Sequence, residues 1–438
     1  METVIRHTRS VCPVCLRNLP ACLTKSDDGQ VLLNKTCPEH GSFRVPVWQG
    51  MVDWDQWLLE TPPLSAAKGL CCPESCGLCS EHESGSCCVL LEVTARCNLR
   101  CRFCFARGGE RTDIPDPDLG ELKRSIRDIV QQCGQPLLQL SGGEPTLRDD
   151  LDELVRFARE AGCSYVQLNT NGIRLAQEPK YAERLAEAGL DIVFLQFDGT
   201  RDEVYETLRG AALLETKTEA IRICGALGIG VTLVPTVVPG VNDSDLGDLV
   251  ALACRMAPAV RGIHFQPVSY FGRYPSKPED TARYTLDRLM ADLSAQAGIP
   301  LSSFMPSRCD HPLCGFHSVF LPEPSGRLRP LSSISHSSHS RGSARDNREY
   351  VARHWRRAPA ESAPVSNASA GLSSEVLSDE MDFDTFLYRL RHESLTLSAM
   401  AFQDAMNLNI ERLHRCSLHV YDHGKVRPFC AKYLSPFE

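Results

Sequence analysis

The sequence has no long apolar run. No stretch approaches the roughly 18 consecutive apolar residues that suggest a transmembrane helix, and residues 1–15 lack the apolar segment of a secretory signal. The chain also lacks an excess of positive charge. Its 47 Lys and Arg stand against 55 Asp and Glu, giving a formal net charge of −8, which argues against a broad nucleic-acid-binding face. These absences predict a cytoplasmic protein that does not bind nucleic acid.

Cysteine, in contrast, is abundant. The 438 residues include 21 cysteines, and in a reducing compartment such a number is more typical of metal ligands than of a disulfide framework. Four cysteines stand alone in helix-like or strand-edge surroundings, where we expect small buried apolar side chains. These are Cys133, Cys163, Cys224 and Cys254. The other cysteines fall in groups whose spacing indicates their chemistry.

Short apolar segments alternate with helical patterns between about residues 88 and 270. Each apolar segment has the composition of a buried strand, and six such βα units predict a parallel sheet, open or partly closed into a barrel. Ligands collect at the carboxyl ends of the strands in such folds. Cys97 follows the first predicted strand and Gly142 ends the second. We therefore expect both residues at the same rim.

The segment "VTARCNLRCRFCFARGG" holds Cys97, Cys101 and Cys104 in the order CxxxCxxC. A structural zinc takes four protein ligands. Three thiolates would instead suit three irons of a [4Fe-4S] cluster, whose fourth iron stays open to an outside molecule. Taken alone, the motif could also arise by chance or be a zinc site with a remote fourth ligand.

This motif, with an aromatic residue before its last cysteine, resembles that of the radical S-adenosylmethionine (SAM) superfamily. "SGGEPT" resembles the GGE motif of the same superfamily, in which the two glycines permit close backbone approach and the glutamate binds the methionine amino group. The resemblance implies a partial (β/α)6 TIM-like barrel with Cys97, Cys101 and Cys104 as the catalytic cysteines. It implies the following cofactor-binding residues: Phe103, Gly142, Gly143, Glu144, Asn169, Asn171, Gln196 and Asp198.

The resemblance also implies the chemistry. A reduced cluster passes an electron to the sulfonium of SAM, which breaks into methionine and a 5′-deoxyadenosyl radical, and this radical abstracts hydrogen from an unactivated C–H bond. The cofactor supplies the reactivity, while the protein positions it and excludes water and oxygen. An electron donor such as ferredoxin or flavodoxin is the implied partner.

Two further cysteine groups precede the CxxxCxxC motif. "CPESCGLCSEHESGSC" offers four thiolates for an auxiliary [4Fe-4S] cluster, with zinc as the alternative metal and Cys71 and Cys88 as alternate ligands. The four are Cys72, Cys76, Cys79 and Cys87. Nearer the start, "CPVC" and "CPEHG" have the spacing of a knuckle around one mononuclear iron or zinc. Its predicted ligands are Cys12, Cys15, Cys37 and either His40 or, less favourably, Cys22; His40 could equally be a turn residue.

The order of these modules resembles the branch of radical SAM enzymes that contains archaeal tetraether lipid synthase, and within that branch the TrsS-type radical SAM (seleno)proteins. The resemblance covers roughly residues 8 to 273. Tetraether lipid synthase carries a further C-terminal cluster, so the chain would hold one or two auxiliary clusters. The candidate ligands are Cys309, Cys314, Cys416 and Cys430, with His311 and His317 as reserve ligands or simple loop residues.

These motifs divide the chain into five expected parts. Residues 1–60 form a metal-binding domain, 61–88 an auxiliary-cluster segment and 89–300 the radical SAM core. A C-terminal domain combines residues 301–330 with 381–438. The Ser-rich residues 331–380 are expected to be a flexible linker or a lid that orders over the substrate.

The expected function is C–C bond formation or one-carbon transfer on a lipid-like or other small substrate, and a lipid substrate would add peripheral contact with a membrane. One alternative is a maturase that modifies a peptide or protein with the help of auxiliary clusters. Another is a non-catalytic scaffold whose cysteines hold structural zinc. The intact GGE motif argues against the scaffold.

Overall fold

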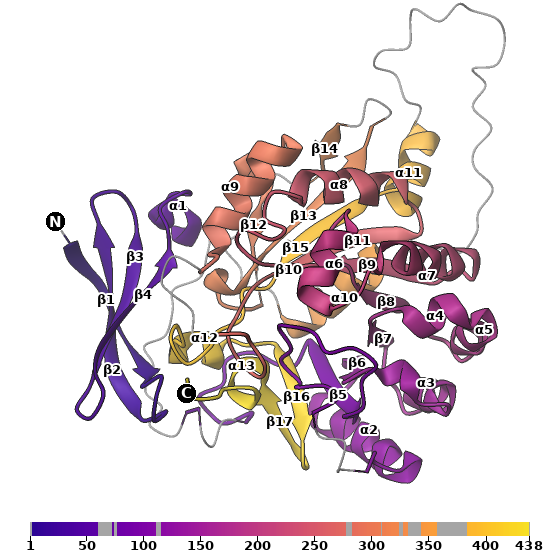
Figure 1. Ribbon diagram of the computed structural model, residues 1–438, viewed down its shortest axis with the longest axis horizontal. Coiled ribbons are helices and arrows are strands. Elements are labelled where there is room, and N and C mark those ends of the chain that lie inside the picture. The colour runs from indigo at the N-terminus through magenta and orange to yellow at the C-terminus, as the bar shows by residue number, and fades with distance from the viewer. Residues whose placement is uncertain are drawn as a thin grey trace, which may run out of the picture.

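The chain folds into a small N-terminal sheet beside a large α/β barrel (Figure 1). The computed structural model describes residues 2–59, 72–73, 77–110, 115–276, 283–307, 309–323, 327–331, 343–356 and 383–437. None of the helices in these ranges is long and apolar enough to cross a membrane. The mixed α/β fold that the sequence predicts is confirmed.

The N-terminal sheet is an antiparallel meander of four strands. These are β1 (Glu2–Val11), β2 (Asn18–Ser26), β3 (Val31–Cys37) and β4 (Gly41–Trp48). A short helix, α1 (Trp54–Leu59), covers its end, because the Trp48 ring packs against Trp54 at a centroid distance of 5.6 Å and against Trp57 at 6.1 Å. Large aromatic contacts of this kind stabilise a sheet too small to build an extensive core of its own.

Six parallel strands form the barrel in sequence order, as the alternating pattern predicts. They are β5 (Cys88–Thr94), β6 (Leu137–Gly142), β7 (Tyr165–Thr170), β8 (Ile192–Gln196), β9 (Gly230–Val234) and β11 (Val260–Pro267). The strands read as nearly continuous apolar runs because side chains on both of their faces are buried. The outer helices are α2 (Leu119–Cys133), α3 (Leu151–Glu160), α4 (Ile173–Gln177), α5 (Pro179–Glu187), α6 (Asp202–Arg209), α7 (Leu214–Ala226) and α8 (Leu246–Arg255).

The C-terminal part of the chain adds a strand to each edge of the open barrel. Strand β15 (Leu395–Ala399) pairs in parallel with β11, and β16 (Leu418–Asp422) pairs in parallel with β5. Residues 400–417, which include α12 (Ile410–His414), therefore bridge the two edges. A tight turn joins β16 to β17 (Lys425–Pro428), with His423 and Gly424 at φ values of 46° and 83°, the left-handed conformation of a tight hairpin.

Most of the remaining elements lie on the β11–β15 side. They are β10 (Thr236–Val237), α9 (Leu286–Ala297), β12 (Met305–Pro306), β13 (Phe316–Pro322), β14 (Leu328–Pro330) and α11 (Phe383–His392), besides short 3-10 turns. Helix α13 (Phe429–Lys432) packs beside β16 and β17 at the other edge. Strand β13 pairs with β15 and extends the sheet past the barrel. Two of the solitary cysteines, Cys163 and Cys224, are buried as expected, and burial raises the pKa of each thiol to about 12.

The N-terminal sheet is tied to the bridging segment 400–417 by buried hydrogen bonds. Lys35, which is 4% exposed, donates from Nζ to the carbonyls of Ala405 and Met406 at 2.8 and 2.7 Å. Ser10 Oγ donates to the carbonyl of Leu408 at 2.6 Å. Because β1 and β3 hold the segment that spans the barrel edges, the sheet and the barrel form one connected structure.

Helix α10 (Ala344–Trp355) falls inside the segment that the sequence predicts as a flexible linker or lid. Ser343 and Asp346 form a capping box at its start, which stabilises an isolated helix end. Val351 and Trp355 pack with the first residues of β6, β7 and β8, so the helix closes the amino-terminal end of the barrel. The GGE motif lies at the opposite end, so this part of the segment is a floor and not a lid. Residues 332–342 and 357–382 lie outside the described residues.

Trp355→Ala should destabilise the barrel. The indole is 9% exposed and packs against the rings of Phe194 and His264 at centroid distances of 5.1 and 6.1 Å, and truncating a buried aromatic costs about 3 kcal/mol or more. Thermal unfolding followed by circular dichroism should show a lower midpoint for this variant. Phe383→Ala, at a residue that is 71% exposed on α11, should leave the midpoint unchanged. Equal shifts in the two variants would contradict the floor packing.

Candidate active site and metal centre

The three cysteines of the CxxxCxxC motif lie in the loop after β5 and line one cavity of about 680 Å³ together with residues 142–144. A residue that is distant in sequence, Arg273, holds this loop in place. Cys104 and Arg273 exchange two backbone hydrogen bonds of 2.9 Å, and Arg273 Nε donates to the Cys101 carbonyl at 2.8 Å. The prediction that the cysteine loop and the GGE motif meet at the carboxyl ends of β5 and β6 agrees with this geometry.

Both glycines of the GGE motif are required by close backbone contacts. A Cβ on Gly143 would lie 2.1 Å from the Arg96 carbonyl oxygen, and Gly142, at φ 127°, would place one 2.3 Å from the Thr94 oxygen. Two hydrogen bonds of 2.8 Å run across the same contact, from Gly143 N to the Thr94 oxygen and from Glu144 N to the Arg96 oxygen. Larger residues would therefore separate the GGE segment from the cysteine loop.

Glu144 is 1% exposed, and its carboxylate accepts four hydrogen bonds. Oε1 accepts from Thr146 N at 3.0 Å, Thr146 Oγ1 at 2.5 Å and Thr170 Oγ1 at 2.7 Å, and Oε2 accepts from Asn171 N at 2.7 Å. These donors fix the carboxylate at the cavity wall and join the ends of β6 and β7. An ammonium bound here would share the acceptor sites with them.

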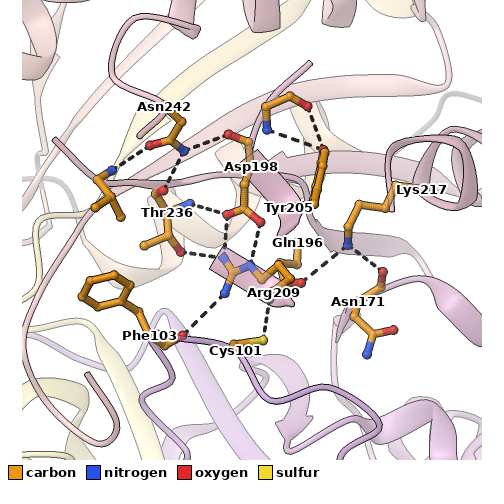
Figure 2. Close-up of polar contacts among 12 residues, drawn as sticks. Cys101, Phe103, Asn171, Gln196, Asp198, Tyr205, Arg209, Lys217, Thr236 and Asn242 are labelled. Atoms are coloured by element: carbon orange, nitrogen blue, oxygen red, sulfur yellow. Dashed lines mark hydrogen bonds and ion pairs between the residues drawn. The ribbon is translucent and has the colours of Figure 1, made fainter. Parts of the chain in front are cut away.

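Four of the other sequence-predicted cofactor residues line the same cavity, namely Phe103, Asn169, Asn171 and Gln196. Asp198 is not among the lining residues. It is buried behind them and forms a bidentate ion pair with Arg209, with distances of 2.7 and 2.5 Å (Figure 2). The structure thus places Asp198 in a supporting position.

Two buried cations near the cysteine loop were missed at the sequence level. Arg209 lines the cavity, and Lys217 lies next to Gln196 (Figure 2). Lys217 shares a face of α7 with the buried Ala220, Ile221 and Cys224. A lysine at an apolar-face position of a helix is the signal that could have identified it.

The donor set fits an iron–sulfur cluster. Burial raises the pKa of Cys97 to about 12, and the negative charges of Glu144 and the other two cysteines act in the same direction. Metal binding would release these protons. Among the described residues these three cysteines are not a group compact enough to hold a single ion. Three thiols that line one cavity suit a [4Fe-4S] cluster, which takes one thiolate on each of three irons.

The N-terminal sheet brings together the predicted knuckle ligands. The ligand atoms of Cys12, Cys15, Cys37 and His40 all lie within 4.8 Å of one another, whereas Cys22 is not part of the group. His40 Nδ1 is 3.6 Å from Cys12 Sγ and 3.5 Å from Cys37 Sγ. At Cys37 burial opposes ionisation, but backbone donors and the His40 ring lower the thiol pKa to about 6. Three thiols and an imidazole at this spacing suit one tetrahedral metal ion.

Comparisons with known proteins agree with both sites. A model of the radical SAM superfamily matches residues 91–253, and a model of the HMPTM N-terminal zinc ribbon domain matches residues 4–49. The 7,8-dihydro-6-hydroxymethylpterin dimethyltransferase of Methanocaldococcus jannaschii is 30% identical over 472 residues, which cover 97% of this chain and 92% of that protein. The chain belongs to the radical SAM superfamily. Its radical SAM core follows an N-terminal zinc ribbon.

Other similar proteins match a smaller part of the chain. Mycofactocin maturase MftC of Mycobacterium ulcerans is 33% identical over 184 residues, and the match covers 41% of this chain and 47% of that protein. The chain thus aligns with about half of the length of MftC. SuiB of Streptococcus suis, solved bound to S-adenosylmethionine, superposes with a TM-score of 0.39 at 17% identity, over 49% of this chain and 48% of SuiB.

The predicted auxiliary-cluster segment is described only in part, because Cys76 lies outside the described residues. Cys87 Sγ accepts from Asn347 Nδ2 of α10 at 3.0 Å, while Cys72 hydrogen-bonds to His414. Within the described ranges the zinc ribbon holds the only compact group of three or more metal-binding side chains. The auxiliary [4Fe-4S] cluster at Cys72, Cys76, Cys79 and Cys87 therefore stays a prediction.

The four C-terminal cysteines lie near one another, since Asp310 acts on Cys309, Cys314 and Cys416, but within the described ranges they do not form a compact group of ligands. Cys309 lines the cavity and interacts electrostatically with Cys87. Cys416 interacts with Cys430 and Cys314, and Cys314 Sγ accepts from Arg412 Nε at 3.4 Å. His311 is buried and binds the backbone of Leu313, as a loop residue would. A second auxiliary cluster made of all four cysteines therefore stays a prediction as well.

His40→Ala should remove the metal of the zinc ribbon. Loss of one of four ligands leaves an incomplete shell, so metal analysis of anaerobically purified protein should show one fewer equivalent of zinc or mononuclear iron per chain. Cys22→Ala serves as the control, because this cysteine lies outside the ligand group, and it should keep the full complement. If His40→Ala retains the metal while Cys22→Ala loses it, the ligand assignment is wrong.

Proposed function

We propose that this chain uses a reduced [4Fe-4S] cluster, held by Cys97, Cys101 and Cys104, to cleave SAM and abstract hydrogen from an unactivated C–H bond. The observation that carries the proposal is the shared cavity of about 680 Å³, which these cysteines line together with the GGE segment. When bound, the cluster supplies the electron that cleaves SAM into methionine and a 5′-deoxyadenosyl radical. A low-potential donor such as ferredoxin or flavodoxin provides that electron.

The residues around the cluster position SAM. Glu144 presents a fixed carboxylate toward the methionine amino group, and Phe103, Asn169 and Gln196 line the path of the nucleoside. Asn171 has a second role, because its Nδ2 donates to Asn98 Oδ1 at 2.7 Å and so holds the cysteine loop against the end of β7. Preorganised contacts of this kind keep the reacting groups in register.

We propose one-carbon transfer as the reaction outcome. The proposal draws its support from the dimethyltransferase relative, whose match covers 97% of this chain, whereas the match to MftC covers 41%. The cavity supports a planar, uncharged substrate such as a pterin. Besides the residues assigned to SAM, its wall carries amide side chains from β6, β7 and β11, which can both donate and accept hydrogen bonds. They are Gln139, Gln167 and Gln266.

The inner end of the cavity also suits a flat heterocycle. Phe194, His264 and Trp355 form an aromatic group there, and burial lowers the pKa of His264 to about 4, so its ring is neutral at pH 7. Trp355 Nε1 and Asn169 Oδ1 are buried, and neither has a partner among the described residues. A donor and an acceptor left open in one cavity indicate a ligand with complementary polar edges.

A lipid-like substrate is the second candidate, consistent with the resemblance to the tetraether lipid synthase-like branch. The observation that favours it is an apolar wall near the cysteine loop, where the rings of Phe271, Phe402 and Phe429 line the cavity and contact one another. A peptide substrate has support only from the likeness to MftC. The shared cavity argues against a non-catalytic zinc scaffold.

Cys101→Ala should abolish SAM cleavage. The iron-replete wild-type protein, incubated without oxygen with SAM and dithionite, should form 5′-deoxyadenosine, measured by liquid chromatography. The variant loses one of three cluster ligands, and formation should fall at least about 100-fold. Cys133→Ala, at a solitary cysteine on α2, should behave like the wild type. Absence of 5′-deoxyadenosine from the iron-replete wild type would refute the proposed function.

Gln167→Leu should separate substrate binding from SAM cleavage. With 6-hydroxymethyl-7,8-dihydropterin as substrate and excess SAM, one SAM is cleaved to the radical and a second donates its methyl group, so the wild type should form a methylated product detected by mass spectrometry. Losing one amide hydrogen bond should reduce that product about tenfold, while 5′-deoxyadenosine formation persists. Gln131→Leu, on the exposed face of α2, is the matched control. Methylation of an isoprenoid or fatty-acyl lipid, but not of the dihydropterin, would favour the lipid candidate instead.

A further inference from the structure

Lys217 is a fully buried lysine behind the cysteine loop. Its side chain is 0% exposed on the apolar face of α7. Nζ donates to the Asn171 carbonyl at 2.9 Å and to Gln196 Oε1 at 3.5 Å (Figure 2). Both acceptors are neutral, and no ion pair between described residues includes Lys217. Nζ also lies 5.6 Å from the centroid of the Tyr205 ring, a neutral cation–π partner. A buried ammonium without an anion beside it is costly, so the site calls for an anion.

The nearby carboxylates are already engaged. Asp198, the first anion that acts on Lys217, forms a bidentate pair with Arg209, so their charges cancel. Glu144 acts on Lys217 more weakly and is held by its own four donors. Cys101 is the remaining acidic group that acts on Lys217. Burial lowers the pKa of Lys217 to about 8, so the ammonium is largely protonated at pH 7.

The lysine also fixes the orientation of an amide beside the cysteine loop. An ammonium can only donate, so Gln196 must turn Oε1 toward Lys217 and Nε2 toward the loop. Nε2 then lies 3.8 Å from Cys101 Sγ and donates to it (Figure 2). Arg209 approaches the same loop, with Nη1 3.5 Å from the Phe103 carbonyl. The polar hydrogens of this wall converge on Cys101.

We propose that Lys217 is the buried counter-cation of the cluster held by Cys97, Cys101 and Cys104, and that it acts partly through Gln196 to stabilise the reduced cluster. The inference rests on the proposed function. One electron, taken from a low-potential ferredoxin or flavodoxin, adds one negative charge to the cluster, and no bond forms or breaks in that step. A buried cation and an N–H···S hydrogen bond both stabilise the more negative state and so raise the reduction potential. Lys217 is a positioning residue that does not touch the reacting atoms.

Lys217→Met tests this role, because methionine fills similar space without the charge. A potentiometric titration monitored by electron paramagnetic resonance should follow the reduced-cluster signal that changes when SAM is added. At a fixed potential the ratio of reduced to oxidised cluster should fall about tenfold, which for one electron corresponds to a reduction potential lower by about 59 mV. Gln196→Leu keeps the charge of Lys217 but removes the donor to Cys101, together with the weaker acceptor of Lys217 Nζ, and the ratio should fall in the same direction by about threefold.

The matched control is Lys35→Met. Lys35 is also a buried lysine bound to backbone carbonyls, but it lies in the zinc ribbon, so its loss should leave the cluster potential unchanged. An iron-replete Lys217→Met protein with an unchanged ratio would overturn the proposal, and so would an equal change in Lys35→Met. If Lys217→Met does not fold, Gln196→Leu tests the proposal instead. An unchanged ratio of reduced to oxidised cluster in that variant would refute the action of Lys217 through Gln196. A wild type without a cluster would refute the proposed function instead.

Discussion

The site depends on one close contact, where the two glycines of the GGE motif lie against the backbone of residues 94–96. A Cβ atom at Gly143 would lie 2.1 Å from the carbonyl oxygen of Arg96, so no side chain fits at this position. The contact fixes the start of the cysteine loop against the end of β6. Gly108, whose Cβ would lie 3.0 Å from Gly143 Cα, brings the far end of the loop back to the same point. Three thiols separated in sequence thereby face one cavity.

The same rim is braced by parts of the chain that are distant in sequence. Arg273 follows the last barrel strand and holds Cys101 and Cys104 by their backbones. On the other side, the segment 400–417 joins the two edge strands and carries Phe402 into the cavity wall. This segment is itself anchored to the zinc ribbon through Lys35. A metal ion in the ribbon would therefore stabilise, through β3, a segment that closes the barrel.

The sequence reveals those parts of the structure that are encoded locally. The six strands have continuous apolar composition, the GGE glycines are short-range backbone requirements, and the ribbon ligands follow a spacing set by tight turns. Long-range contacts are not encoded in this way. Nothing within "REYVARHW" indicates that α10 packs under β6, β7 and β8, nor within β16 that its partner is β5. The ion pair between Asp198 and Arg209 also depends on tertiary packing. The position of Asp198 at the end of a strand suggests a cofactor-binding role, because the sequence does not show that Arg209 engages this carboxylate.

The distribution of charge divides the cavity into regions with different tasks. Acidic and basic side chains line two parts of the wall. Glu144 and Arg209 lie beside the cysteine loop with Lys217 behind it, and Asp310 and Asp346 lie beside Cys309 and the start of α10. Another part of the wall carries the neutral amides of Gln139, Gln167 and Gln266, and His264 is held in its uncharged form by burial. Fixed charges have their largest effect on a group that changes its charge, as a cluster does on reduction. Hydrogen abstraction by a carbon radical creates no net charge, so the neutral region is suited to hold the substrate without opposing that step.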